Sequence, residues 1–349
     1  MKQYLEIIRI LAIGLVIFNH LPGYYAYMLP HPKFLEFGYI AITMITRINV
    51  PLFLMISGVT LLGKKDSLQK QFSRIFRILA LMIVLSLLMY TLIILQNGGA
   101  EGFWIKNYIY DFLSGKIAYL GSYWFLYAYL GFLVSLPLVQ YIAANLEQKD
   151  FYVILGAKVF FTSLIPVINF VLMLNEKTPI AISGNLQIAF IGLKELFYPL
   201  MGYYLANKKQ DKKEICVWGI VALIGLIIAE TLTYIQGQVG GVYTQDYVQL
   251  FDYLLAIFVF SFLRYVVERK IEPYNFKICK TVSKFGGCAF GIYLFDPFFK
   301  LCFGDKIIDY LCEYMPDVIG SIIWVVISMC IGGIITNILK KNRILSRLI

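Results

Sequence analysis

Apolar runs about as long as a lipid bilayer is thick alternate along the chain with short polar segments. A helix that crosses a bilayer needs about 20 predominantly apolar residues, and its backbone groups must be satisfied within the segment. The pattern therefore predicts an all-α, polytopic membrane protein with ten transmembrane helices. The predicted spans are residues 5–28, 39–62, 76–96, 122–143, 152–173, 186–206, 215–236, 247–266, 283–303 and 318–339.

Lysine and arginine are concentrated in the segments that follow the second, sixth and eighth predicted spans and in the C-terminal tail. These segments read KKDSLQKQFSRIFR, KKQDKK, ERKIEPYNFKICK and KKNRILSRLI. Segments after odd-numbered spans, such as QNGGAEGFW and NEKTPIAISGN, carry few basic residues. Because basic loops stay on the cytoplasmic side, the sequence predicts that both termini face the cytoplasm.

The segments between spans are too short for a soluble domain, so residues 1–349 are interpreted as one membrane-embedded domain. Residues 103–118 are too polar to span comfortably, and their aromatic residues, two lysines and Asp111 suit a helix in the outer interface. The first apolar run contains Glu6 and Arg9 and precedes no small-residue cleavage site. It is therefore interpreted as a retained helix and not as a signal peptide.

Composition excludes a soluble fold. Hydrophobic residues make up 60% of the chain and charged residues 15%, whereas soluble domains contain about 45–50% apolar and about 25% charged residues. The formal net charge of +10 lies mainly in short loops, so it is assigned to topology and not to nucleic-acid binding. The six cysteines show no spacing that predicts a metal site, and a Cys302–Cys312 disulfide is left open.

The first predicted span carries an acid, a base and an imidazole on one stripe. Arg9 and His20 are eleven residues apart, which places them within about 20° of one helix face and about 16 Å apart along the axis. Glu6 lies one turn before Arg9 and can pair with it. An ionisable residue at membrane depth usually faces a cavity and marks a functional site, although Arg9 alone could also reach to the cytoplasmic interface.

A basic cluster lies at the cytoplasmic mouth of the third span. Arg74 and Arg77 share a helix face, and Lys64, Lys65 and Lys70 lie nearby in the sequence. Such a cluster could hold a polyanion such as the phosphates of a nucleotide. The alternative is a role in topology and in binding anionic lipid headgroups.

Two other segments combine small or aromatic residues. Pro51 marks a start or a kink in the second span, and Ser57 and Gly58 form a small pair that lets another helix or a ligand approach closely. Tyr123 and Trp124 in GSYWFLY, residues 121–127, begin the fourth span. They suit an aromatic belt at the interface, or a surface on which a sugar or lipid acceptor stacks.

Taken together and in order, these segments resemble the acyltransferase-3 family of membrane acyltransferases. The matching stretches are Glu6-x-x-Arg9 followed after ten residues by His20, VPLFLMISG (50–58), Arg-x-x-Arg (74–77), YWFLY (123–127), FYPLMGYYLA (197–206) and VSKFGGCAFGIYLFDPFF (282–299). Each stretch is weak alone, but the ordered set covers nearly the whole chain. In two places the sequence departs from the family pattern: Glu6 stands where an Asp is frequent, and Asp296 where a His is common.

The resemblance implies transfer of an acyl group, commonly acetyl from acetyl-CoA, to a hydroxyl of a cell-surface polysaccharide or of its lipid-linked precursor. We expect His20 to be the general base, Arg9 to hold the donor, and Glu6 to orient Arg9. The expected CoA-binding residues are Arg74, Arg77 and Ser57, and the expected substrate-binding residues are Tyr123, Trp124 and Asp296. No metal is expected, and the expected location is the bacterial cytoplasmic membrane.

Three alternatives stay open at this stage. Transfer could pass through an acyl-enzyme on Ser57 or on a cysteine. A transporter or flippase for a lipid-linked glycan or small solute would also place polar residues inside a helical bundle, although no inverted repeat is visible. A membrane sensing module without chemistry is the third.

Overall fold

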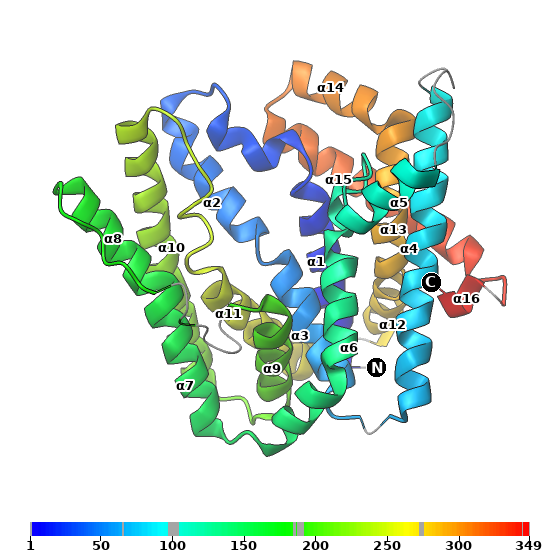
Figure 1. Cartoon of the computed structure of the whole chain (residues 1–349), viewed down its shortest axis with the longest axis horizontal. Helices are drawn as coiled ribbons and strands as arrows, with labels where there is room; N and C mark the ends of the chain where they lie inside the picture. The colour runs from blue at the N-terminus through cyan, green and yellow to red at the C-terminus, as the bar shows by residue number, and fades with distance from the viewer. Residues whose placement is uncertain are drawn as a thin grey trace.

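The fold is taken from a computed structural model, and every regular element in the described residues is a helix (Figure 1). The described residues are 2–64, 66–96, 105–183, 186, 192–271, 276–343 and 345–348. The prediction of an all-α chain is confirmed for this part of the sequence.

Six helical segments are long and apolar enough to cross a membrane, and a bent pair near the N-terminus makes a seventh if its two parts count as one span. They are Lys33–Leu61, Leu68–Gln96, Gly121–Asn145, Gln148–Leu174, Lys212–Gly240 and Asp317–Leu339, with the bent pair Gln3–Phe18 and Pro22–Met28. Each overlaps a predicted span. The count of ten spans and the cytoplasmic location of both termini stay predictions.

The other three predicted spans contain shorter helices. The span 186–206 overlaps α9 (Lys194–Asn207, 14 residues), 247–266 contains α11 (Asp252–Val266, 15 residues), and 283–303 contains α13 (Ala289–Phe299, 11 residues). A charged residue begins both α9 and α11, and Gly287 and Cys288 separate α13 from α12 (Phe276–Gly286). Residues 187–191 lie outside the described part.

The first span is broken around His20. Helix α1 (Gln3–Phe18) ends two residues before it, and a 3-10 helix, η1 (Pro22–Met28), continues at an angle of 60°. Pro22 has no backbone N–H and disfavours a helical residue before it, and Leu21 is accordingly extended, with φ −120° and ψ 160°. The prediction of one helix through residue 28 missed this Leu-Pro-Gly signal.

The second span is broken as well, at Arg47 and Ile48, between α2 (Glu36–Thr46) and α3 (Asn49–Leu61). Pro51 is the third residue of α3, so it marks a helix start and not a kink. The two breaks lie at the same depth, because asparagine side chains join them. Asn19 Nδ2 donates to Thr46 O and Asn49 Nδ2 donates to Leu15 O, both at 3.4 Å.

Helices α3 and α9 pack with their backbones almost in contact. A Cβ atom on Gly58 would lie 1.9 Å from the carbonyl oxygen of Pro199, and one on Gly202 would lie 2.2 Å from that of Met55. Small residues permit such approaches in membrane helices. The prediction that Ser57 and Gly58 admit a neighbouring helix is confirmed for Gly58.

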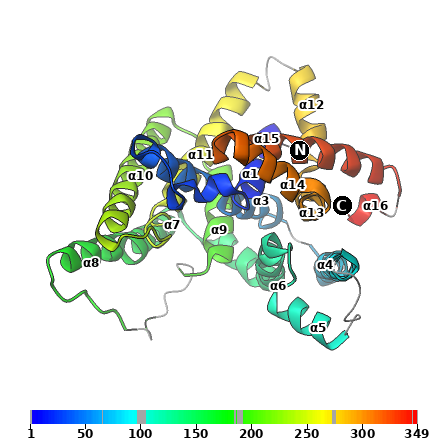
Figure 2. The same ribbon diagram turned by 90° about the horizontal axis from the view of Figure 1, so that it is seen from above.

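Helices α1, α3, α9 and α11 form the centre of the molecule (Figures 1 and 2). On one side lie α4 (Leu68–Gln96) and α6 (Trp124–Asn145), and on the other lie α7 (Gln148–Val159), α8 (Ile165–Leu174) and α10 (Lys212–Gly240). Helices α14 (Asp305–Tyr314), α15 (Asp317–Leu339) and the short α16 (Leu345–Leu348) complete the C-terminal part. Cys302 and Cys312 are both free, so the structure contains no disulfide between them.

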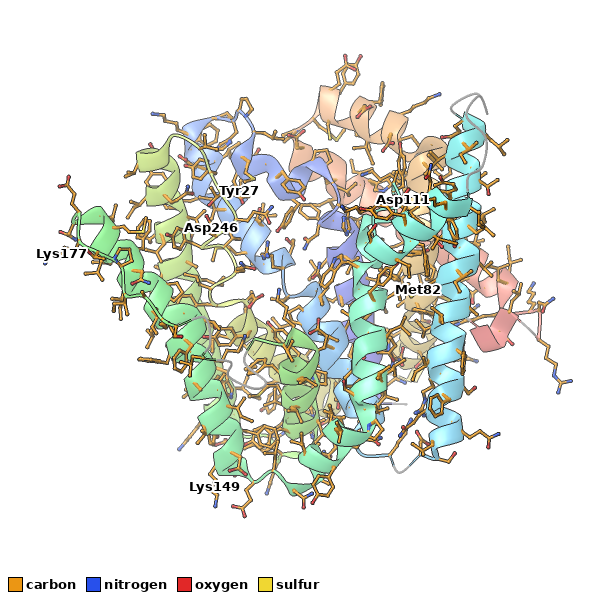
Figure 3. All side chains as sticks on the ribbon, viewed as in Figure 1. Tyr27, Met82, Asp111, Lys149, Lys177 and Asp246 are labelled. Atoms are coloured by element: carbon orange, nitrogen blue, oxygen red, sulfur yellow. The ribbon has the colours of Figure 1, made fainter. Side chains whose placement is uncertain are left out.

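The two ends of the molecule differ in their connections. The loops after α3, α6 and α9 share one end, which also holds Lys149 (Figures 1 and 3). Near the opposite end lies Asp111 on α5 (Ile105–Ser114), a helix that runs across α4 and α6 (Figures 2 and 3). Helix α5 thus covers most of the segment 103–118 that was predicted to lie at an interface, and residues 103–104 lie outside the described part.

We predict that Gly58→Ala destabilises the protein, because the new methyl group would overlap the backbone of α9. Overpacking typically costs about 1–3 kcal/mol. Thermal unfolding of the detergent-purified protein measures the effect. Gly131→Ala on α6 is the matched control, since no atom lies within 4 Å of the added Cβ; equal losses in both variants would contradict the prediction.

Candidate functional site

A cavity of about 610 Å³ lies between the central helices and is lined by residues from both helix breaks. Of the nine residues predicted to form the site, five line it and four do not. The lining residues are Arg9, His20, Ser57, Arg77 and Trp124, and the others are Glu6, Arg74, Tyr123 and Asp296. The structure therefore brings residues of four predicted spans to one space.

One end of the cavity, here the Arg9 end, contains Arg9, Ser57, Arg77, Tyr129 and Lys340. Arg9 forms an ion pair with Glu6, whose side chain is only 2% exposed. The second carboxylate oxygen of Glu6, Oε2, is buried and has no hydrogen-bond partner among the described residues. Glu6 therefore holds Arg9 at the cavity wall, as the spacing of one helical turn predicted.

Helix α12 reaches the Glu6–Arg9 pair through a glycine. A Cβ atom on Gly286 would lie 2.6 Å from Glu6 Oε2 and 2.8 Å from Glu6 Cβ. Gly286 and Gly287 also line the cavity. The close approach explains why the chain has glycine at the end of α12, where any side chain would displace Glu6.

The two arginines of α4 have different surroundings. Arg77 lines the cavity, whereas Arg74 forms an ion pair with Asp66, which also accepts a bond of 2.6 Å from Lys70. Hydrogen bonds from Lys70 and Arg74 lower the pKa of Asp66 to about 2, so Asp66 is ionised at neutral pH. Nη1 of Arg74 is buried without a hydrogen-bond partner among the described residues.

The basic side chains of Arg9, Arg74 and Arg77 lie near Tyr129 on α6. The charges of Arg77, Arg74 and Arg9 all act on its hydroxyl group, and Ser57 is its hydrogen-bonding neighbour. The arginines predicted from two separate segments thus meet around one tyrosine. Lys65 of the predicted basic cluster lies outside the described residues.

The His20 end is defined here by the lining residues His20, Tyr24, Arg47, Trp124 and Gln245, of which Arg47 is hydrogen-bonded to Tyr24 and Gln245. His20 follows α1 in a turn in which its own N–H donates to Ile17 O at 3.1 Å. Lys300 Nζ donates to the carbonyl oxygen of His20 at 3.0 Å. Lys300 thereby holds the backbone of the turn that presents the histidine.

Asp296 lies behind this contact and does not line the cavity. Its carboxylate accepts a hydrogen bond of 2.5 Å from Ser328 Oγ, and the charge of Lys300 acts on it. Because Lys300 in turn holds His20 O, Asp296 is connected to His20 through one lysine.

Aromatic rings line the wall near the start of α6. Trp124 lines the cavity directly, while Tyr123 is buried and donates to Leu294 O at 2.7 Å. Tyr123 stacks on Tyr293 with ring centroids 5.7 Å apart, and Tyr293 lines the cavity and donates to Ser122 O at 2.7 Å. Tyr123 therefore contributes by holding Tyr293.

Four charged residues of the cavity wall were not predicted from the sequence. They are Arg47, Lys194, Asp252 and Lys340. Three of them fall inside predicted spans, where a charge is itself a sign of function, and this signal could have found them. Lys340 was assigned to the basic tail, but its ammonium group donates to Gly287 O beside the Arg9 end.

The charge balance of the cavity is strongly positive. Among the lining residues that the structure describes, five are lysine or arginine and one, Asp252, is a carboxylate. Excess positive charge in a space of low dielectric favours an anionic ligand. Within the described ranges, the side chains of His, Cys, Asp and Glu form no cluster of three that could hold a metal ion.

Comparison with known families agrees with this arrangement. A family model described as an acyltransferase domain, Acyl_transf_3, matches residues 2–339 of the 349-residue chain. The chain therefore belongs to the acyltransferase-3 family and is a multi-pass membrane acyltransferase. No match is found among curated proteins or among solved structures.

We predict that Gly286→Ala destabilises the protein mainly through Glu6. In a Glu6→Ala background the added methyl group no longer meets the carboxylate, so part of the cost disappears. Thermal unfolding of the two single variants and the double variant measures a coupling, expected at about 0.5–3 kcal/mol for residues in contact. Strictly additive losses would show that Gly286 acts independently of Glu6.

Proposed function

We propose that the protein is an O-acyltransferase that moves an acyl group, acetyl in the simplest case, from acyl-CoA to a glycan. The acceptor is a hydroxyl of a cell-surface polysaccharide or of a lipid-linked glycan, and the enzyme works in the bacterial cytoplasmic membrane. The observation that carries the proposal is that Arg9 and His20 line one cavity in a chain of the acyltransferase-3 family.

In the proposed arrangement the acyl donor occupies the Arg9 end of the cavity and the acceptor occupies the His20 end. Arg9 lies nine residues before the end of α1 at Phe18, about 13 Å of helix, and His20 lies in the turn beyond it, so a long donor arm can bridge them. The donor enters at the Arg9 end with its phosphates near Arg77, which lines the cavity, and near Arg74 one helical turn away, whose buried Nη1 has no hydrogen-bond partner among the described residues. Ser57 lies along this wall, and the thioester then points toward the His20 end.

In the proposed reaction the acceptor oxygen attacks the carbonyl carbon of the thioester. A carbon–oxygen bond forms and the carbon–sulfur bond breaks. His20 takes the proton of the hydroxyl group as attack begins and returns it to the departing sulfur, which leaves as CoA. Imidazole suits both steps because its ordinary pKa lies close to neutral pH.

Aromatic residues support the proposed binding of a sugar near His20. Trp124 lines the His20 end and offers a face on which a sugar ring can stack, and Tyr293 adds a second ring. Tyr123 and Asp296 were expected to touch the substrate; in the proposal they position Tyr293 and Lys300 instead.

We predict that His20→Ala lowers acceptor-dependent transfer about 10²–10⁴-fold, the usual contribution of general acid–base catalysis. Release of CoA from acetyl-CoA by the purified protein measures this rate with and without a crude glycan-lipid extract. An unchanged melting temperature shows that the variant is folded. Near-normal transfer by folded His20→Ala protein would refute its role as the base.

We predict that Arg77→Gln raises the KM for acyl-CoA about 10- to 100-fold, because a hydrogen bond to a charged group typically contributes about 1.5–3 kcal/mol. The effect on kcat should be smaller. Arg343→Gln removes the same charge from an exposed residue that does not line the cavity and should leave KM unchanged. An equal rise in both variants would indicate a general surface-charge effect.

A further inference from the structure

Arg47 at the break between α2 and α3 has only neutral partners among the hydrogen bonds of the described residues. Its Nη1 donates to the hydroxyl of Tyr24 and, at 3.1 Å, to Gln245 Oε1, and its Nη2 donates to Gln249 Oε1 at 3.0 Å. These bonds fix the guanidinium group without neutralising it. The group is therefore oriented in advance for a negative charge.

Further cations surround the same place. Lys194 begins α9 and lines the cavity. The charges of Lys194, Arg47 and Lys158 all act on Asp252, which accepts a hydrogen bond of 3.2 Å from the hydroxyl of Tyr198. Of the residues that line the cavity here, Arg47 and Lys194 thus share one carboxylate, Asp252. The two cations outnumber this carboxylate in a space of low dielectric, so a ligand that brings a negative charge would be favoured here.

The Arg47 region is separate from the proposed CoA phosphate site. The bonds of Asn49 to Leu15 O and of Asn19 to Thr46 O place Arg47 at the level of residues 15–19 of the first span. Arg9 lies six or more residues earlier, which is about 9 Å or more along the helix axis. Arg47 is instead at the level of the turn that contains His20, because Asn19 and Thr46, the residues just before them, are hydrogen-bonded.

We propose that Arg47 and Lys194 bind an oxyanion of the acceptor, so that the sugar accepting the acyl group carries a carboxylate or a phosphate. The inference rests on the proposed function, which supplies the sugar acceptor. The neutral side chains around Arg47, including Tyr24 and Gln245, can hydrogen-bond the sugar hydroxyls beside the anionic group.

Binding of sugar anions to the full-length, detergent-purified protein tests this without relying on catalysis. Glucuronate and glucose 1-phosphate should raise the melting temperature at equal ionic strength, whereas glucose should not. The stronger of the two anions identifies carboxylate or phosphate as the group that is bound. No shift with either anion would overturn the proposal.

Variants locate the binding. We expect Arg47→Gln and Lys194→Gln each to weaken anion binding about 10-fold or more, Arg47→Lys to restore part of it, and Arg343→Gln to leave it unchanged. Lys194 is exposed, so its variant remains informative if Arg47→Gln fails to fold. Undiminished anion binding in both glutamine variants would overturn the proposal. So would loss of the rise in melting temperature when CoA is saturating, because the anion would then bind at the CoA site.

Transfer assays with the same sugars separate this inference from the proposed function. An anionic sugar should be acylated with a kcat/KM at least about 10-fold above that of glucose, and Arg47→Gln should remove this preference. Equal use of all three sugars by an active enzyme would overturn the anionic subsite alone. Anion binding that depends on Arg47, without transfer from any acyl donor, would support the subsite and overturn the proposed function.

Discussion

The structure depends on a break in the first membrane segment between Phe18 and Pro22, because backbone groups freed inside a bilayer must find partners. Side chains from four other elements supply them. Thr43 donates to Tyr24 O at 2.6 Å, Asn49 to Leu15 O at 3.4 Å and Lys300 to His20 O at 3.0 Å, while Ser321 accepts from the N–H of Gly23 at 2.9 Å. The fixed turn presents His20 to the cavity, so the same bonds that permit the break also build the site.

Close helix packing allows the cavity to exist beside this break. The contact of Gly58 and Gly202 brings α3 and α9 together, and Gly286 lets α12 meet α1 at Glu6. Dispersion and packing hold membrane helices where the hydrophobic effect between them is weak. The polar interior is thus surrounded by contacts that leave no room for a methyl group, and small changes there should reach the arginine and histidine that line it.

Much of the site could be predicted from sequence, because an ionisable residue in an apolar run is informative by itself. Arg9 and His20 were found in this way, and Arg77 was found as part of a basic cluster; all three line the cavity. The break at His20 was missed because hydropathy does not register Pro22. Arg47 carries the same signal as Arg9, a charge inside a predicted span, but the break that gives it polar partners was not predicted. The contacts of Gly58 and Lys300 could not be predicted, since they depend on which distant segment packs beside each residue.

Under the proposed function, the two helix breaks allow cationic side chains to line the cavity, where they can bind anionic substrates. A straight apolar pair of helices could not keep Arg47 at the level of the His20 turn, because a guanidinium group in the middle of a span needs polar partners. Tyr24 is brought to Arg47 by the bend after α1, and Gln245 by the segment between α10 and α11. The breaks therefore create a place where a cation is stable and still able to meet an anion. Basic groups also stand at the Arg9 end, so a donor and an acceptor that both carry negative charge can approach His20 from opposite ends.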